Sequence, residues 1–190
     1  VCNLFEFLRV FPYQWSSNEV MLYQCSCSFD HFIVISFWVY VGGVGEMVVV
    51  EQGSEMNIQN LAEVLRERKV SVIFFVPSHL MLLSETSNLG RCENLRLTMT
   101  AGEALSWKLV KKLKLTYKKQ IKFWNVYGPT ETTVDVSYYD TSLERNNDKI
   151  ENYVAIGKSF PGVQLRISSD SSLWLCGNQV SNGYIGRDEI

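Results

Sequence analysis

The sequence predicts an α/β protein in which a mostly parallel sheet is covered by helices on both faces, followed by the start of a small β-rich subdomain. Two observations lead to this prediction. Apolar runs rich in β-branched and aromatic residues alternate with segments of helical periodicity as far as residue 127. After Glu131 the pattern changes, and short strand-like runs are separated by polar and turn residues. We therefore expect a partial α/β core over residues 1–139 and a loop and β-rich subdomain over residues 140–190, entered near Ile156.

The individual elements follow from periodicity and from the residues that interrupt it. The residues between 58 and 68 place Ile58, Leu61 and Leu65 on one face, as an amphipathic helix requires. Pro77 ends the apolar run before it, and Ser78 is expected to cap the short helix that follows. The predicted helices cover residues 29–41, 58–68, 78–83 and 108–119. The predicted strands cover residues 47–50, 70–76, 95–100, 121–127, 134–139, 163–167 and 173–176.

Composition and charge exclude several classes of protein. The 190 residues are 46% hydrophobic and 20% charged, which is typical of a folded domain with a core. The net charge of −2 gives no overall attraction to nucleic acid or to an anionic membrane. The lysines between residues 108 and 119 alternate with Leu109, Val110 and Leu113, so they predict the solvated face of a helix, with a nucleic-acid patch as the alternative.

The cysteines and the most apolar stretch bear on whether the protein has a metal site, disulfide bonds or a membrane span. Five cysteines without a C-x-x-C pair, together with only two histidines, predict neither a zinc site nor a disulfide framework, and they favour the reducing cytoplasm. His79 has no acid placed to complete a triad, so we interpret it as structural. Residues 32–50 are long enough for a membrane span, but glycines and Glu46 divide them, so a buried helix and strand are expected there.

Two predicted strands end in loops that contain a glycine and a carboxylate. These are T-A-G-E at residues 100–103 and Y-G-P-T-E at residues 127–131. In an open α/β sheet, ligands bind at the carboxyl ends of the strands. Glycine lets the backbone approach a flat ring, Tyr127 offers a stacking face, Thr130 can donate to a phosphate and Glu131 can hold Mg²⁺. The residues alone predict a nucleotide-and-magnesium site, and two ordinary capped turns are the alternative.

The stretch N-V-Y-G-P-T-E, residues 125–131, resembles the core motif of the adenylate-forming (AMP-dependent synthetase-ligase) superfamily, in particular the amino-acid adenylation domains of nonribosomal peptide synthetases. S-F-D at 28–30 is similar to the family's F-D-x-S motif, although Phe32 replaces its serine. Three further segments follow in the family's order. They are L-T-M-T-A-G-E-A-L-S at 97–106, I-G-K-S-F-P-G-V-Q-L-R-I at 156–167 and S-L-W-L-C-G-N-Q-V-S-N-G-Y-I at 172–185.

This resemblance covers almost the whole chain but only the middle of the family's domain. The family's phosphate-gripping loop, its ribose-binding aspartate and the C-terminal domain with the catalytic lysine have no counterpart here. We therefore expect a fragment that does not turn over by itself.

The resemblance implies ATP and Mg²⁺ as cofactors and a role for each matching residue. Thr130 and Glu131 would be catalytic, with Thr130 at the α-phosphate and Glu131 on the metal, and Asp30 would bind the substrate's α-ammonium. The adenine slot would be formed by Gly102, Glu103, Asn125, Val126, Tyr127 and Gly128, with the amide of Asn125 on the adenine amino group. The pocket for the substrate side chain would be lined by His31, Val34, Phe74, Met99, Ala101, Val126, Val134 and Asp135.

The implied function is ATP-dependent activation of an amino-acid carboxylate as an aminoacyl-adenylate, for transfer to the phosphopantetheine thiol of a carrier protein. An acyl-CoA synthetase of the same superfamily is one alternative, which Asp30 disfavours because a fatty acid has no ammonium. A non-catalytic remnant that serves as a binding or interaction module is another. Asp135 predicts a polar or basic substrate, unless the strand register over residues 132–137 turns its side chain away.

Overall fold

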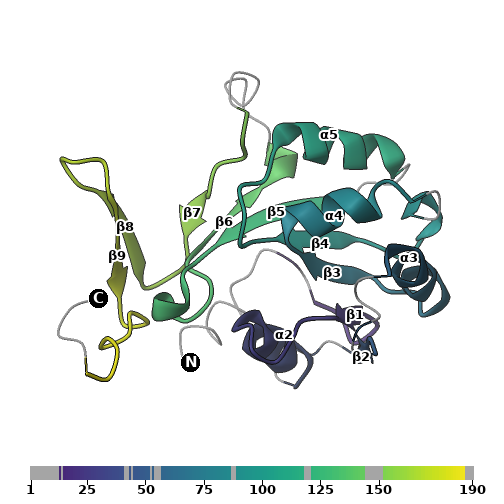
Figure 1. Ribbon diagram of the computed structural model, residues 1–190, viewed down its shortest axis with the longest axis horizontal. Helices are drawn as coiled ribbons and strands as arrows, with labels where there is room; N and C mark the ends of the chain where they lie inside the picture. Colours follow the sequence, from purple (N-terminus) through teal and green to yellow (C-terminus); the bar gives the residue numbers. More distant parts are fainter. Residues whose placement is uncertain are drawn as a thin grey trace.

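Seven strands form one twisted sheet in the order β2-β1-β3-β4-β5-β6-β7 (Figure 1). The structure is a computed structural model that describes residues 13, 15–40, 43, 45–51, 53, 57–86, 89–117, 121–143 and 152–186. The strands are β1 (Val20–Tyr23), β2 (Glu46–Val49), β3 (Val72–Phe75), β4 (Leu97–Thr100), β5 (Lys122–Tyr127), β6 (Ser137–Asp140) and β7 (Lys158–Ser159). The pairs among β1 to β5 are parallel, whereas β6 and β7 add to the edge as antiparallel strands. The predicted mostly parallel sheet is confirmed.

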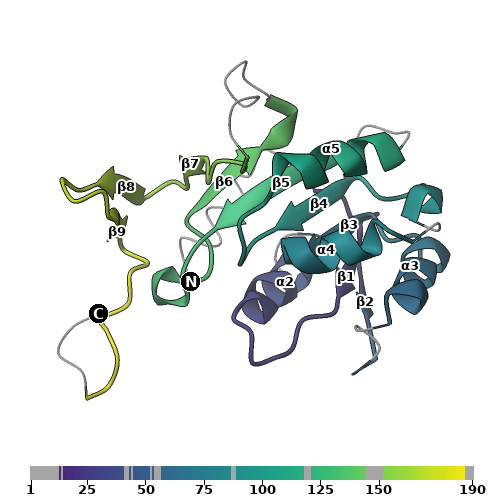
Figure 2. The same ribbon diagram turned by 45° about the horizontal axis from the view of Figure 1, so that its top comes forward.

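Helices cover both faces of this sheet, as the alternation of strands and helices predicts (Figures 1 and 2). On one face, α3 (Ile58–Glu67), α4 (Pro77–Leu83) and α5 (Trp107–Thr116) pack against the strands through buried residues such as Leu61, Leu80 and Val110. On the other face, α2 (His31–Tyr40) contributes Val34, Ile35 and Trp38 to a second cluster. In α5 the residues Leu109, Val110 and Leu113 are buried while Lys108, Lys111 and Lys112 are exposed, so the helix is amphipathic. Among the described helices, none has both the length and the apolar character needed to cross a bilayer.

The chain after the main sheet forms a small antiparallel hairpin, β8 (Val163–Ile167) and β9 (Leu173–Gly177). In Figure 1 it projects beyond β6 and β7, away from the helices. Val163 packs into the same cluster as α2, so the hairpin is joined to the core at its base. The division between two units at residue 139 stays a prediction.

The structure corrects the sequence analysis at three places. Strand β1, which the sequence analysis did not anticipate, lies inside the sheet between β2 and β3. Ser78 does not cap α4, because the N-cap is Val76 and the Ser78 hydroxyl donates to the Glu103 carboxylate at 2.8 Å. The strand expected from residue 134 begins only at Ser137, because Thr133 and Val134 have positive φ angles of 61° and 73°. β-branched residues rarely adopt this conformation, which costs about 1–3 kcal/mol per residue and must be held by surrounding contacts.

A buried polar network joins the amino-terminal ends of three neighbouring strands. Glu19, just before β1, is only 1% exposed. Its carboxylate accepts hydrogen bonds from the Tyr13 hydroxyl at 3.0 Å, from the Ser71 hydroxyl before β3 and from the Arg96 guanidinium before β4. The network therefore fixes the strands at the edge of the sheet opposite to their carboxyl ends.

Candidate functional site

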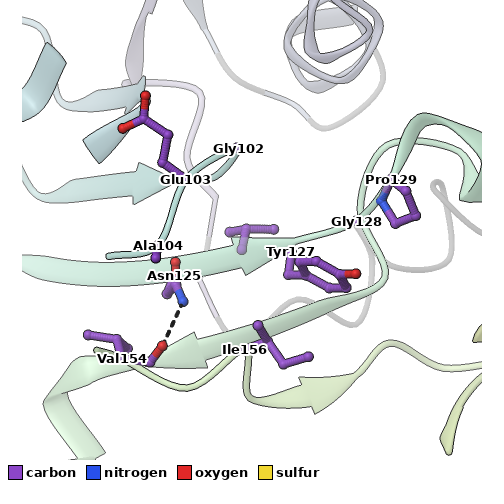
Figure 3. A pocket seen from close by; sticks show the side chains of 10 residues that line it. Gly102, Glu103, Ala104, Asn125, Tyr127, Gly128, Pro129, Val154 and Ile156 are labelled. Carbon is purple, nitrogen blue, oxygen red and sulfur yellow. Dashed lines mark hydrogen bonds between the residues drawn. The ribbon is translucent and has the colours of Figure 1, made fainter. Parts of the chain in front are cut away.

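A cleft of about 420 Å³ lies where the loops after β4 and β5 meet the segment that leads to β7 (Figure 3). The carboxyl ends of parallel strands meet at one edge of the sheet, so these two loops come together although the sequence separates them. The residues that line the cleft are Gly102, Glu103, Ala104, Asn125, Val126, Tyr127, Gly128, Pro129, Val154 and Ile156. All the residues expected around an adenine ring are among them, and Thr130, expected at the α-phosphate, follows directly after Pro129. Val154 and Ile156 were not anticipated, because their segment follows a long polar stretch without a motif.

Asn125 is held in one orientation by the segment opposite. It is 4% exposed, and its Nδ2 donates to the carbonyl oxygens of Val154 at 3.3 Å and Ala155 at 3.0 Å. Two carbonyl acceptors define which end of the amide is the NH₂ group. The Oδ1 atom is therefore available as an acceptor at the cleft wall, which suits an exocyclic amino group.

The rest of the cleft wall is apolar or is backbone. Figure 3 shows Tyr127 and Ile156 on neighbouring parts of the wall, while the carboxylate of Glu103 points away from Asn125. That carboxylate accepts from the backbone N–H of Ser78 at 2.9 Å and from its hydroxyl, so Glu103 offers the cleft its backbone. Gly102 has a φ of +84°, a conformation that glycine adopts without strain. A flat ring fits between such surfaces.

Thr130, Glu131 and Asp30 lie together beyond the end of the cleft. Thr130 begins the short 3₁₀ helix η3 (Thr130–Thr132), and its Oγ1 donates to Oδ2 of Asp30 at 2.5 Å. Asp30 directly precedes α2, but its carboxylate is engaged by a loop 100 residues further on. The structure thus brings the residue expected at the substrate ammonium next to the residue expected at the phosphate.

Glu131 presents a carboxylate in a polar setting that suits a hard cation. The hydroxyl of Tyr184 donates to its Oε1, and this hydrogen bond lowers the pKa of the carboxyl, so the group is ionised at neutral pH. Among the residues that the structure describes, no three His, Cys, Asp or Glu side chains gather into a larger metal site. One carboxylate with substrate phosphates is a usual way for proteins to hold Mg²⁺, so the donor fits this ion.

The residues expected at the substrate side chain also come together, on the α2 face of the sheet. Val34, Phe74, Met99, Val126 and Val134 are all buried in one apolar cluster, and Ala101 packs against it. They come from α2, from the three strands β3 to β5 with the loop after β4, and from the loop before β6. The set therefore forms part of one packed cluster on this face of the sheet.

Two polar residues lie in this apolar surrounding. The His31 ring stacks on Phe74 with centroids 3.3 Å apart, and its Nδ1 is 3.8 Å from Oδ2 of Asp135. Both side chains are at most 3% exposed, so Asp135 points inward and does not turn to solvent. Burial lowers the pKa of His31 to about 3, while burial and the nearby charge of Asp30 raise the pKa of Asp135 to about 7. Between these two pKa values both groups are therefore uncharged.

The raised pKa of Asp135 predicts a pH-dependent gain in stability for Asp135→Asn. As pH rises from about 4 to about 7, the unfolded chain loses this proton while the folded chain keeps it, so the parent chain is destabilised. The variant avoids this loss, and its advantage should grow by up to roughly 1.4 kcal/mol per pH unit. His31 gives the opposite slope in both chains, so its contribution cancels in the comparison. Urea unfolding at four pH values between 4.5 and 7.5 measures the difference, and a difference that does not change with pH would contradict the prediction.

A second cavity, of about 280 Å³, lies at the carboxyl ends of β1 and β3 and was not anticipated. It is lined by Gln24, Cys25, Ser26, Phe29, Phe74, Phe75, Val76 and His79. His79, interpreted as structural from the sequence, thus faces a cavity, and its ring meets Phe75 edge-on at 5.0 Å. Burial raises the pKa of the Cys25 thiol to about 11, so this cysteine is not a reactive thiolate. Of the residues expected at the substrate side chain, Phe74 is the one that also lines this cavity.

Comparisons with known proteins agree with the motifs. A family model described as AMP-binding enzyme matches residues 1–185, and the chain belongs to this family. It is 29% identical to bacitracin synthase 1 of Bacillus licheniformis over 92% of this chain, and 26% identical to tyrocidine synthase 3 of Brevibacillus parabrevis over 100%. The crystal structure of the Vibrio cholerae adenylation domain AlmE, in complex with glycyl-adenosine-5'-phosphate, has a TM-score of 0.77 at 21% identity and 98% coverage of this chain.

The chain is short beside these proteins. It spans 3% of bacitracin synthase 1, 3% of tyrocidine synthase 3 and 36% of the AlmE chain. The resemblance to adenylation domains is confirmed for the part of the domain that the chain represents.

Proposed function

We propose that this chain is the nucleotide- and substrate-binding centre of an enzyme that activates an amino-acid carboxylate with ATP. The observation that carries the proposal is the cleft itself, in which Asn125, Tyr127 and the two glycine loops line a single 420 Å³ space. A glycyl-adenylate occupies the AlmE domain, whose fold this chain shares. In the proposed arrangement, the adenine lies in the cleft with its amino group on Oδ1 of Asn125.

The proposed reaction is an in-line displacement at the α-phosphorus of ATP. A carboxylate oxygen of the amino acid forms the new P–O bond, the bond to the β-phosphate bridging oxygen breaks, and pyrophosphate leaves. Mg²⁺, when bound, would neutralise charge on the phosphates. Thr130 would give up its hydrogen bond to Asp30 and donate to an α-phosphate oxygen, and Glu131 would hold the ion. Positioning and electrostatics would then supply the catalysis without a protein nucleophile. The phosphopantetheine thiol of a carrier protein would then attack the carbonyl carbon of the adenylate, so that the aminoacyl group forms a thioester and AMP leaves.

Asp30 would orient the substrate by accepting from its α-ammonium. The hydrogen bond from Thr130 already directs this carboxylate toward the site of phosphate chemistry. Asp135 and His31 would give the side-chain pocket its polar floor, because a buried carboxyl is most stable with a donor nearby. We therefore propose a substrate that bears an amide or an amine over a plain aliphatic one.

Equilibrium binding to the purified chain tests this function. We expect binding of ATP and, more tightly, of non-hydrolysable aminoacyl-adenylate mimics, with polar and basic side chains preferred. Tyr127→Leu removes a stacking face, so it should weaken adenine binding about 10-fold. The matched control is Tyr40→Leu, because Tyr40 is 79% exposed and lies on α2 outside the cleft. Asp30→Asn should weaken binding of the aminoacyl mimic and leave binding of AMP unchanged.

The outcomes separate the proposal from its rivals. Equal affinity for aminoacyl and plain acyl mimics would indicate an acyl-CoA synthetase. Absence of any adenine-dependent binding would indicate a remnant with another role. We expect no ATP–pyrophosphate exchange from this chain alone, and exchange above a Glu131→Ala control would contradict that expectation.

A further inference from the structure

The segment Gln179–Tyr184, here called the strap, lies against the loop that carries Glu131. The backbone N–H of Ser181 donates to the carbonyl oxygen of Glu131 at 2.7 Å. The Tyr184 hydroxyl donates to Oε1 of the same residue, from a position 53 residues further along the chain. The strap thus contacts both the backbone and the side chain of the residue proposed to hold the metal.

Three more hydrogen bonds define how the strap and the loop fit together. Nε2 of Gln179 donates to the carbonyl oxygens of Thr132 at 2.9 Å and Asp135 at 3.1 Å. The Thr133 hydroxyl donates back to the carbonyl oxygen of Gln179 at 2.9 Å. Gln179 is only 9% exposed, so these bonds are shielded from water. They also hold Thr133 and Val134 in the strained, positive-φ conformations that the loop requires.

We infer that the strap is a positioning device for Glu131, in which Tyr184 holds Oε1 so that Oε2 is presented to the metal and the phosphates. This inference rests on the proposed function for the role of Glu131. A glutamate side chain that is not held has several rotamers, and fixing it in advance removes an entropy cost that metal binding would otherwise bear. A carboxylate accepts several hydrogen bonds, so the bond from Tyr184 does not compete with a cation on the other oxygen.

Tyr184→Phe tests the inference because it removes one oxygen atom and keeps the ring. The dissociation constant of ATP is measured without and with Mg²⁺. The ratio of the first value to the second is the gain in affinity that depends on the metal. This gain should fall about 5-fold in Tyr184→Phe, while the affinity for AMP without Mg²⁺ and the melting temperature stay unchanged. Tyr153→Phe is the matched control, since Tyr153 is 57% exposed, similar to Tyr184 at 53%, and should change nothing.

A double-mutant cycle tests whether Tyr184 affects metal-dependent binding through Glu131. Because Tyr184 acts through Glu131, the Tyr184→Phe substitution should have no further effect in a Glu131→Gln background. Additive losses would overturn the inference. The ring-carbon resonance of Tyr184 in chain labelled with ¹³Cζ-tyrosine gives an independent readout without metal. The chemical shift of this carbon should change in Glu131→Gln. It should stay the same in the control Glu46→Gln, because Glu46 lies on β2.

The two proposals fail in different ways. A Tyr184 resonance that ignores Glu131→Gln would overturn the positioning role alone and leave the proposed function standing. ATP affinity that does not depend on Mg²⁺ in the parent chain would overturn the metal assignment of Glu131, and this inference with it.

Discussion

Arg96→Met is expected to destabilise the fold by about 3–5 kcal/mol, because it leaves the buried Glu19 carboxylate without its cation. Glu19 is 1% exposed, whereas the Arg96 side chain in this ion pair is 54% exposed, so the guanidinium lies between the buried charge and solvent. The Tyr13 and Ser71 hydroxyls remain as donors but carry no charge. Urea unfolding monitored by tryptophan fluorescence measures the loss.

An exposed ion pair of the same type provides the control. Arg68 lies 3.0 Å from Glu46 with both side chains more than half exposed, so Arg68→Met should cost no more than about 1 kcal/mol. Replacing both Glu19 and Arg96 by Met should restore most of the lost stability, since it removes the unpaired charge. If the double variant is as unstable as Arg96→Met, packing and not charge explains the effect.

Gly128→Ala is expected to disrupt the nucleotide cleft and to cost about 1–3 kcal/mol of stability. A Cβ atom at this position would lie 2.1 Å from the carbonyl oxygen of Val134 and 2.6 Å from Cα of Asp135. Both neighbours are backbone, and Gln179 of the strap donates a hydrogen bond to the carbonyl oxygen of Asp135, so they cannot move aside cheaply. The loop that carries Thr130 and Glu131 must shift, and binding of AMP should weaken at least about 10-fold.

Another glycine serves as the control for this substitution. At Gly90, in the short helix η2 (Leu89–Arg91), the nearest atom to an added Cβ is the Thr116 carbonyl oxygen at 3.3 Å. Gly90→Ala should therefore change stability much less and leave AMP binding intact. Calorimetric titration with AMP and thermal unfolding of both variants provide the comparison. Normal AMP binding by Gly128→Ala would show that the close approach at this turn is not needed for the cleft.

Local sequence pattern determined the α/β architecture and the two loops that form most of the cleft. Apolar strands followed by glycine-containing loops specify a parallel sheet, and such a sheet brings the loops at residues 101–104 and 128–131 to one edge. Strand direction thus predicted which two loops meet, and the resemblance to adenylation domains supplied the individual residues, whereas Val154 and Ile156 were not anticipated. Helix α5 was also predictable from local pattern, because helical spacing by itself places its buried apolar residues on one face and its lysines on the opposite face.

Only the tertiary structure decided the contacts between residues far apart in the chain. Periodicity gave residues 134–139 as a strand, but the turn at Gly128 and the strap keep Thr133 and Val134 in positive-φ conformations and direct Asp135 inward, toward His31. Serine is a residue type that often caps helices, yet the Ser78 hydroxyl donates instead to the carboxylate of Glu103, 25 residues further along the chain. The hydrogen bond between Tyr184 and Glu131 joins two motifs that sequence reasoning treated separately. Side-chain partners of this kind depend on where the folded chain places them, and a pattern with a period of 2 or 3.6 residues contains no such information.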